Sequence, residues 1–180
     1  GSCGQAALHQ EVRINSSDPV NVPGEILTKG PNVLLGYYKN EEDTGQTIDK
    51  DGWFHTGDLG LMDEDGNVFI KGRSKNMLLG SNGQNIYPEE IEDKLNSLPL
   101  VSECLVIQSG EKLIALVHPD YDEAQNLGLN ADDLKNIMEE NRTQLNTIVP
   151  AYCKVAEIRI QEEEFEKTPK KSIKRFLYTE

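Results

Sequence analysis

The stretch Gly52-Trp53-Phe54-His55-Thr56-Gly57-Asp58-Leu59-Gly60, followed by Gly72-Arg73-Ser74-Lys75, is the most informative part of this 180-residue chain. It pairs a carboxylate between glycines, Asp58, with a guanidinium at a fixed spacing, Arg73. A carboxylate held in this way can accept hydrogen bonds from both hydroxyls of a ribose, and an arginine fork can grip a phosphate or a second ribose oxygen. Alone, Gly57-Asp58 would favour a plain turn, because Asp and Gly dominate turns. Together the two groups indicate nucleotide handling.

The residues around this pair predict short β-strands separated by turns, so residues 1–73 are expected to form an all-β piece. An acidic run at Asp63-Glu64-Asp65 lacks the remaining ligands of a calcium loop, and no metal site is predicted. The expected strands are Glu11–Ile14, Gly24–Lys29, Phe54–Met62 and Asn67–Lys71, with a hairpin turn at Asp65-Gly66.

After Arg73 the pattern changes to mixed strands and helices. Pro88 suits a first helical position, and Asn130 can cap a long helix that ends at Pro150. We therefore predict an α+β fold: a short all-β subdomain, residues 1–73, followed by a small α+β domain, residues 74–180, whose antiparallel-type sheet is flanked by helices. The expected elements of the second domain are a helix from Pro88 that Pro99 stops, strands Cys104–Gln108 and Leu113–His118, the long helix, and a strand Val155–Ile160.

The amino-acid composition indicates which binding partners and which cellular location to expect. The chain has 31 acidic and 18 basic residues and a formal charge of -13, which disfavours a nucleic-acid backbone or an anionic membrane surface. No apolar run approaches the length of a membrane span or forms a secretory leader. Cys3, Cys104 and Cys153 have no spacing typical of disulfides or zinc, which favours a reducing compartment. A cytoplasmic location is expected.

Further motifs lie in order around the Asp58–Arg73 pair: Gly24–Gly30, Val33–Tyr38 and Gly83–Glu92, with a weaker one at Phe165–Leu177. In this order the sequence resembles the adenylate-forming enzymes, the superfamily of acyl-CoA synthetases, luciferases and adenylation domains. The run Gly80–Ile86 and the Thr-Pro-Lys-Lys segment at 168–171 are most similar to long-chain fatty-acid CoA ligases.

The resemblance implies a two-step reaction. A carboxylate, here a fatty acid, reacts with ATP to give an acyl-adenylate and pyrophosphate, and the acyl group then passes to the thiol of CoA. By motif match, Asp58 would hold the ribose hydroxyls of ATP or AMP and Arg73 would contact ribose or phosphate. Gly83 would let the backbone approach the pantetheine arm of CoA, although an ordinary turn glycine explains it nearly as well. Lys75 falls at the family's hinge position between the two domains.

The resemblance also implies a catalytic lysine near the C-terminus, and here two alignments stay open. The family pattern is Gly-Lys followed by two residues and a basic pair. Lys171 fits as the lysine of this pattern, but the preceding glycine is absent. A shifted alignment puts Ser172 at the lysine position and leaves Lys171 or Lys174 as substitutes. Serine cannot supply the positive charge that the transition state requires.

No phosphate loop or acyl pocket of the family is recognisable, and residue 1 already falls late in the family's order. The sequence therefore predicts a C-terminal fragment that is inactive alone, with magnesium and much of the ATP bound by a missing N-terminal domain. Two alternatives remain: an adenylation domain that loads a carrier protein, and a non-catalytic nucleotide-binding or interaction module with the same fold.

Overall fold

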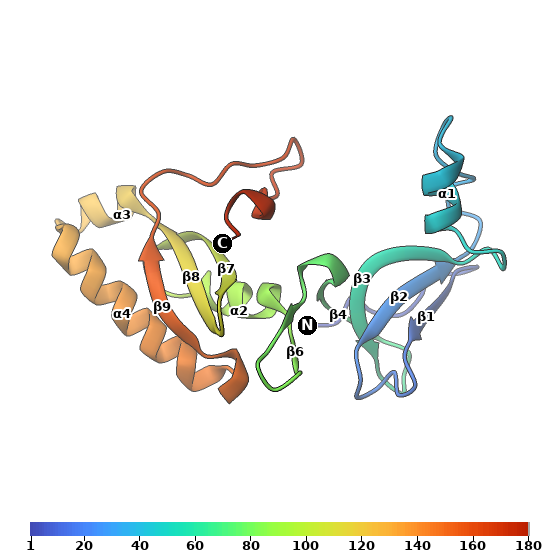
Figure 1. The fold of residues 1–180 in the computed structure, drawn as a ribbon, viewed down its shortest axis with the longest axis horizontal. Coiled ribbons are helices and arrows are strands. Elements are labelled where there is room, and N and C mark those ends of the chain that lie inside the picture. Colours follow the sequence, from blue (N-terminus) through green and yellow to red (C-terminus); the bar gives the residue numbers. More distant parts are fainter. Residues whose placement is uncertain (180) are drawn as a thin grey trace. The chain divides into compact units, whose positions relative to one another are not determined.

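The computed structural model describes residues 1–179 and divides the chain into two compact units, residues 1–76 and 77–180 (Figure 1). The division falls directly after a short 3-10 turn, η1 (Ser74–Asn76). Among the described residues, no helix combines the length and the apolar character needed to cross a membrane.

Unit 1 is built on a four-stranded antiparallel sheet whose strands lie in chain order. Its small core joins Ile14, Ile26 and Val68 from three of the strands. Asp63 accepts hydrogen bonds from the backbone N–H groups of Asp65 and Asn67, which closes the hairpin expected at Asp65-Gly66. The strands are β1 (Glu11–Asn15), β2 (Gly24–Lys29), β3 (Phe54–Met62) and β4 (Val68–Arg73).

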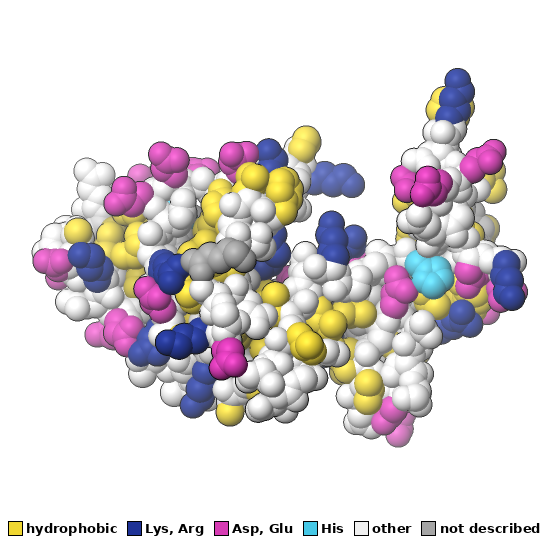
Figure 2. Space-filling view, in the orientation of Figure 1, with side chains coloured by type: hydrophobic (Ala, Val, Ile, Leu, Met, Phe, Trp, Pro, Cys, Tyr) yellow, Lys and Arg dark blue, Asp and Glu magenta, His cyan; other side chains and the backbone are white. Residues whose placement is uncertain are grey.

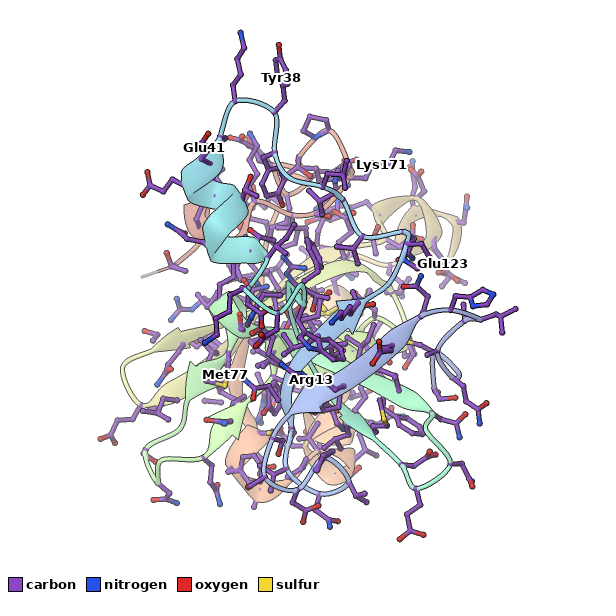
Figure 3. All side chains as sticks on the ribbon, turned by 90° about the vertical axis from the view of Figure 1, so that its right-hand side faces the viewer. Arg13, Tyr38, Glu41, Met77, Glu123 and Lys171 are labelled. Atoms are coloured by element: carbon purple, nitrogen blue, oxygen red, sulfur yellow. The ribbon has the colours of Figure 1, made fainter. Side chains whose placement is uncertain are left out.

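One short helix of unit 1, α1 (Glu41–Thr47), is missing from the sequence expectation of strands alone. Asn40 caps it by accepting from the backbone N–H of Asp43 at 3.1 Å. None of its residues is buried, so it carries no apolar stripe by which a pattern search would find it. Figure 3 shows Glu41 at the start of this helix and Tyr38 at the tip of the loop before it.

Unit 2 is organised around a three-stranded sheet in the order β7-β8-β9. The antiparallel pair β7 (Val101–Ser109) and β8 (Lys112–Pro119) forms the predicted hairpin, whereas β9 (Val155–Ile160) runs parallel to β8. A separate small hairpin joins β5 (Leu78–Leu79) to β6 (Asn85–Ile86).

Helices cover one face of this sheet. Leu95 and Leu145 are fully buried there, in a cluster with alternate residues of β7 and β8. The long helix begins at a capping box in which Asn130 and Asp133 exchange side-chain and backbone hydrogen bonds, as Asn130 led us to expect. The helices are α2 (Pro88–Leu95), α3 (Tyr121–Asn126) and α4 (Ala131–Ile148), with a 3-10 turn η2 (Ala151–Cys153).

The C-terminal tail, residues 161–179, covers the other face. Phe165 is buried against Leu105, Ile107 and Ile114, whose side chains point away from the helices. The tail ends in a 3-10 turn, η3 (Arg175–Leu177), which lies beside the sheet in Figure 1. Hydrophobic atoms remain exposed around this turn in Figure 2. The α+β fold class predicted from the sequence is confirmed.

Candidate functional site

Asp58 and Arg73, the two residues predicted to handle a nucleotide, lie together at one end of the β3–β4 ladder. They are direct partners in the antiparallel register. Arg73 donates from Nη1 to Asp58 Oδ1 at 2.6 Å, and the side chains are 47% and 30% exposed. An ion pair this exposed contributes little to folding. Because both side chains are partly exposed to solvent, a ligand can reach them.

A bulge in β3 sets the position of Asp58. Between two positions paired with β2, β3 advances from His55 to Leu59, four residues, while β2 advances only two. Gly57 lies in this extra stretch with a φ of +71°, a left-handed conformation that suits a residue without Cβ. Bulges beside functional sites often re-aim a side chain. The glycine before Asp58 therefore belongs to a strand bulge rather than to a chain reversal.

Glu25, on the neighbouring strand β2, holds the bulge in place. Its Oε1 accepts from the backbone N–H of Gly57 at 3.0 Å, and its Oε2 accepts from His55 Nδ1 at 2.8 Å. Thr56 adds a second link, since its Oγ1 accepts from Asp58 N–H at 3.0 Å and donates to a β2 carbonyl at 2.8 Å. Sequence reasoning gave Glu25 no role; its only signal was its place in the Gly24–Gly30 motif.

Gly83 lies in the β5–β6 turn of unit 2. Its φ is +74°, and its backbone N–H donates to Gly80 C=O at 2.9 Å. A Cβ placed on Gly83 would meet no atom within 4 Å. The turn conformation thus favours glycine by itself, and the space beside its backbone is open.

Lys75 is exposed within η1, the last element of unit 1. The division between the units falls between Asn76 and Met77, so only Asn76 separates it from this lysine. The residue predicted as a hinge therefore lies close to the point where contacts within one unit give way to contacts within the other.

The basic loop, residues 166–174, forms a tight hairpin at the C-terminal end of unit 2. Thr168 N–H donates to Ser172 C=O at 2.8 Å, and Lys171 N–H donates to Thr168 C=O at 2.8 Å. Lys171 itself has a φ of +61°. A left-handed residue after a turn is the usual place for glycine in such a hairpin, so Lys171 occupies a position whose backbone favours glycine.

The lysines of the basic loop differ in their partners. Lys167 binds Glu103 at 2.6 Å, and Lys174 binds Glu166 at 3.0 Å. The Glu103 carboxylate raises the pKa of Lys167 and keeps it charged. Lys171, at the exposed tip of the hairpin, has no ion pair with any described residue. Figure 3 marks Lys171 in the tail of unit 2.

A largely buried ion pair lies next to this loop. Arg175 donates from Nη2 to Glu92 Oε2 at 2.8 Å and from Nη1 to Val106 C=O at 2.9 Å. Glu92 Oε1 accepts from Val106 N–H at 2.6 Å. Burial raises the pKa of Glu92, while hydrogen bonding and attraction from Arg175 oppose the shift. Sequence reasoning placed Arg175 within the weaker motif Phe165–Leu177 and did not predict this contact.

The residues that the structure describes offer no group of three His, Cys, Asp or Glu side chains placed to hold a metal ion. The magnesium expected with ATP is therefore assigned no ligand in residues 1–179. The described residues are better suited to bind a nucleotide than a metal ion, because the partly exposed Asp58 carboxylate and Arg73 guanidinium lie together on one strand pair.

Residues 75–180 match the family described as the AMP-binding enzyme C-terminal domain. The 2-succinylbenzoate–CoA ligase of Bacillus cytotoxicus is 44% identical over 115 residues, which cover 62% of this chain and 24% of that protein. The indoleacetate–CoA ligase of Aromatoleum aromaticum is 41% identical over 128 residues, covering 66% of this chain and 25% of that protein. The chain thus spans about a quarter of the length of these relatives.

Solved structures extend the similarity over nearly all of the chain. The anthranilate CoA ligase AuaEII, in complex with anthranoyl-AMP, superposes with a TM-score of 0.82 at 26% identity, over 98% of this chain and 33% of that one. The O-succinylbenzoate coenzyme A synthetase of Bacillus subtilis, in complex with AMP, gives a TM-score of 0.75 at 25% identity, over 99% and 35%.

Proposed function

Because the chain belongs to the AMP-binding enzyme family, we propose that it is the C-terminal part of an ATP-dependent ligase that joins a carboxylic acid to CoA. The observation that carries this proposal is the Asp58–Arg73 pair, which lies exposed at the end of a strand ladder in a chain whose relatives are CoA ligases. Residues 1–73 would be the last β subdomain of the large domain, and residues 74–180 the mobile C-terminal domain, with Lys75 at the hinge.

In this proposal the two exposed groups of unit 1 bind the nucleotide. Asp58 accepts hydrogen bonds from the ribose hydroxyls, and Arg73 directs its planar fork at a ribose or phosphate oxygen. The bulge held by Glu25 keeps the carboxylate at the end of the ladder rather than within it. Affinity for AMP should therefore depend on Glu25 as well as on Asp58.

The basic loop would serve the first half-reaction. There a substrate carboxylate attacks the α-phosphorus of ATP, a P–O bond to pyrophosphate breaks, and negative charge builds on the phosphate oxygens. The backbone of Lys171 supports the shifted alignment, with Lys171 at the glycine position and Ser172 at the lysine position. Because Lys174 is engaged by Glu166, we assign the catalytic charge to Lys171.

Three substitutions test this assignment in the parent enzyme. Lys171→Met should slow acyl-adenylate formation more than transfer of the acyl group to CoA, and Lys174→Met should be tolerated better. Ser172→Lys should raise the rate of adenylate formation, because it restores an ammonium at the lysine position of the pattern. An equal loss in both half-reactions for Lys171→Met would overturn the role.

For the second half-reaction we propose that CoA passes the β5–β6 turn. The open space beside Gly83 would admit the pantetheine arm close to the backbone. Gly83→Ala would then raise the KM for CoA without changing adenylate formation. Equal effects on both steps would indicate an ordinary turn glycine.

The acid itself has two candidates. The Thr-Pro-Lys-Lys segment favours a long-chain fatty acid, whereas the relatives are named for 2-succinylbenzoate and indoleacetate, both aromatic acids.

A cytoplasmic location remains a prediction. We propose that CoA is the acceptor rather than a carrier protein, since these relatives are named as CoA ligases.

One observation favours a second function, a non-catalytic nucleotide-binding module. A serine at the lysine position would remove the charge that drives adenylation. The deciding experiment measures pyrophosphate release from ATP with palmitate, 2-succinylbenzoate and indoleacetate, for the chain alone and for the chain extended upstream. Release only with the extended protein would support the ligase. AMP binding without release in any sample would support the module.

A further inference from the structure

We propose that Glu92 and Arg175 form a lock that positions the basic loop, and that Arg175 is a positioning residue for the lysine chemistry of that loop. The lock itself is inferred from the contacts within unit 2. Its catalytic consequence rests on the proposed function.

Three hydrogen bonds connect Glu92, Arg175 and the backbone of Val106. Both oxygens of Glu92 are occupied, one by Val106 N–H and one by Arg175, while Arg175 also donates to Val106 C=O. The two side chains are only 12% and 18% exposed. A charge pair this buried is costly to break, because removal of one partner leaves the other without compensation.

The lock also completes the edge of the sheet. β7 is an edge strand, and Val106 is paired across the hairpin with Ala115. The N–H and C=O of Val106 go to Glu92 and Arg175, so they point outward from the sheet. A carboxylate and a guanidinium here replace the two hydrogen bonds that a further strand would make. Lysine cannot reproduce this fork, since it is a single point charge.

Arg175 follows the basic loop directly in the chain, which makes the lock the loop's anchor. Lys174 N–H donates to Glu166 C=O at 2.8 Å, and Lys167 bridges to Ile173, so the two arms of the loop are tied to each other. Fixing Arg175 thereby fixes both arms. The partner carboxylate lies on α2, 83 residues earlier in the chain.

The other fastenings of the loop are weaker. Phe165 and Tyr178 stack edge to face at 5.1 Å, and Tyr178 Oη accepts from Glu166 N–H at 2.8 Å. Lys167 reaches Glu103 through a more exposed ion pair. Without the lock, these contacts would have to hold a loop that carries four lysines of like charge, residues 167, 170, 171 and 174.

Hydrogen exchange of the complete 180-residue chain tests the lock. Arg175→Lys and Glu92→Gln should each speed exchange of the Thr168, Lys171 and Lys174 amides at least about tenfold more than exchange of the α4 amides. Arg159→Gln is the control, because it removes an exposed ion pair with Glu157 in the same unit. Unchanged loop exchange in both folded variants would overturn the lock.

A second arm tests the catalytic consequence in the upstream-extended ligase. Arg175→Lys should lower the rate constant of acyl-adenylate formation about tenfold while changing the KM for ATP by no more than about twofold. Faster loop exchange with undiminished adenylation would overturn the positioning role. A wild-type extended protein that makes no adenylate would overturn the proposed function instead, and the exchange result would still decide the lock.

Discussion

The bulge at Gly57-Asp58 in unit 1 and the basic loop in unit 2 present charged groups by two different constructions. In each, one glutamate holds the segment in place. Glu25 does so from the neighbouring strand by accepting from a backbone N–H and from His55. Glu92 does so across 83 residues, through a largely buried ion pair with Arg175.

This difference indicates how each segment should respond to damage. The bulge lies within a four-stranded ladder, so the strands on either side persist when Glu25 is removed. The basic loop lies at the end of a tail that crosses a sheet face, and its position depends on one buried pair and a small apolar cluster. Damage to the bulge should remain local, whereas damage to the lock should spread through unit 2.

The largest expected effect is therefore that of Arg175→Ala. It leaves the Glu92 carboxylate buried without its cation, which should lower the free energy of unfolding of unit 2 by about 3–5 kcal/mol. Urea unfolding followed by far-UV circular dichroism would measure the change. The exposed pair of Arg159 with Glu157 provides the control, and Arg159→Ala should cost about 0–1 kcal/mol. Similar losses for the two variants would remove the contrast.

Glu25→Ala should have the next largest effect. It removes the acceptor for Gly57 N–H and His55 in a half-buried position, at a cost of about 1–2 kcal/mol. Trp53 is the single tryptophan of the chain and lies in unit 1, so its fluorescence reports this unfolding selectively. A loss as large as that of Arg175→Ala would show that the bulge also depends on one carboxylate.

These two regions also differ in how far the sequence predicts them. Asp58 and Arg73 were expected to act together, and the short β3–β4 hairpin with its Asp65-Gly66 turn places them in one register. Arg175 and Glu92 both lie inside recognised motifs. The residues next to each of them in the sequence do not indicate that the two side chains will pair with each other and with the backbone of Val106. The alternation of apolar residues along a strand indicates which of its side chains are buried. It does not indicate which sheet face the C-terminal tail, residues 161–179, will cover.

The helices make the same point. α4 has an apolar stripe and a cap at Asn130, and the sequence predicts it from both signals. α1 has no buried residue, and α3 buries only Ala124, so neither helix has an apolar stripe from which the sequence could predict it. The parallel pairing of β9 with β8 likewise depends on the α4 crossover rather than on any residue of the strand.

A smaller effect is expected from Lys171→Gly, which probes the tip of the basic loop. Because Lys171 has a φ of +61°, glycine should relieve backbone strain and stabilise unit 2 by about 0.5 kcal/mol after its greater freedom in the unfolded chain is counted. Lys170→Gly, at a neighbouring position without a positive φ, should destabilise it. Chemical unfolding of both variants measures the pair, and a loss of stability in Lys171→Gly would contradict the strained turn.

The smallest effect is a difference in pH dependence between carboxylates of the two units. Burial raises the pKa of Glu92, so its contribution to stability is fully present below the ordinary value of 4.5 and is lost as pH rises through the raised folded value. In unit 1, hydrogen bonds from Asn67 lower the pKa of Asp63, so its contribution is present above the ordinary value of 3.8 and is lost as pH falls through the lowered one.

Glu92→Gln isolates the Glu92 part of this contrast, since glutamine does not titrate. As pH falls from 7 toward 4.5, the wild-type unit 2 should gain stability relative to Glu92→Gln, because the protonated carboxyl no longer carries a buried charge. Asp63→Asn should show the opposite trend at lower pH when unit 1 is followed by Trp53 fluorescence. A difference between wild type and Glu92→Gln that stays constant across this range would mean that Arg175 fully offsets the burial of Glu92. The lock would then be an ion pair throughout this pH range.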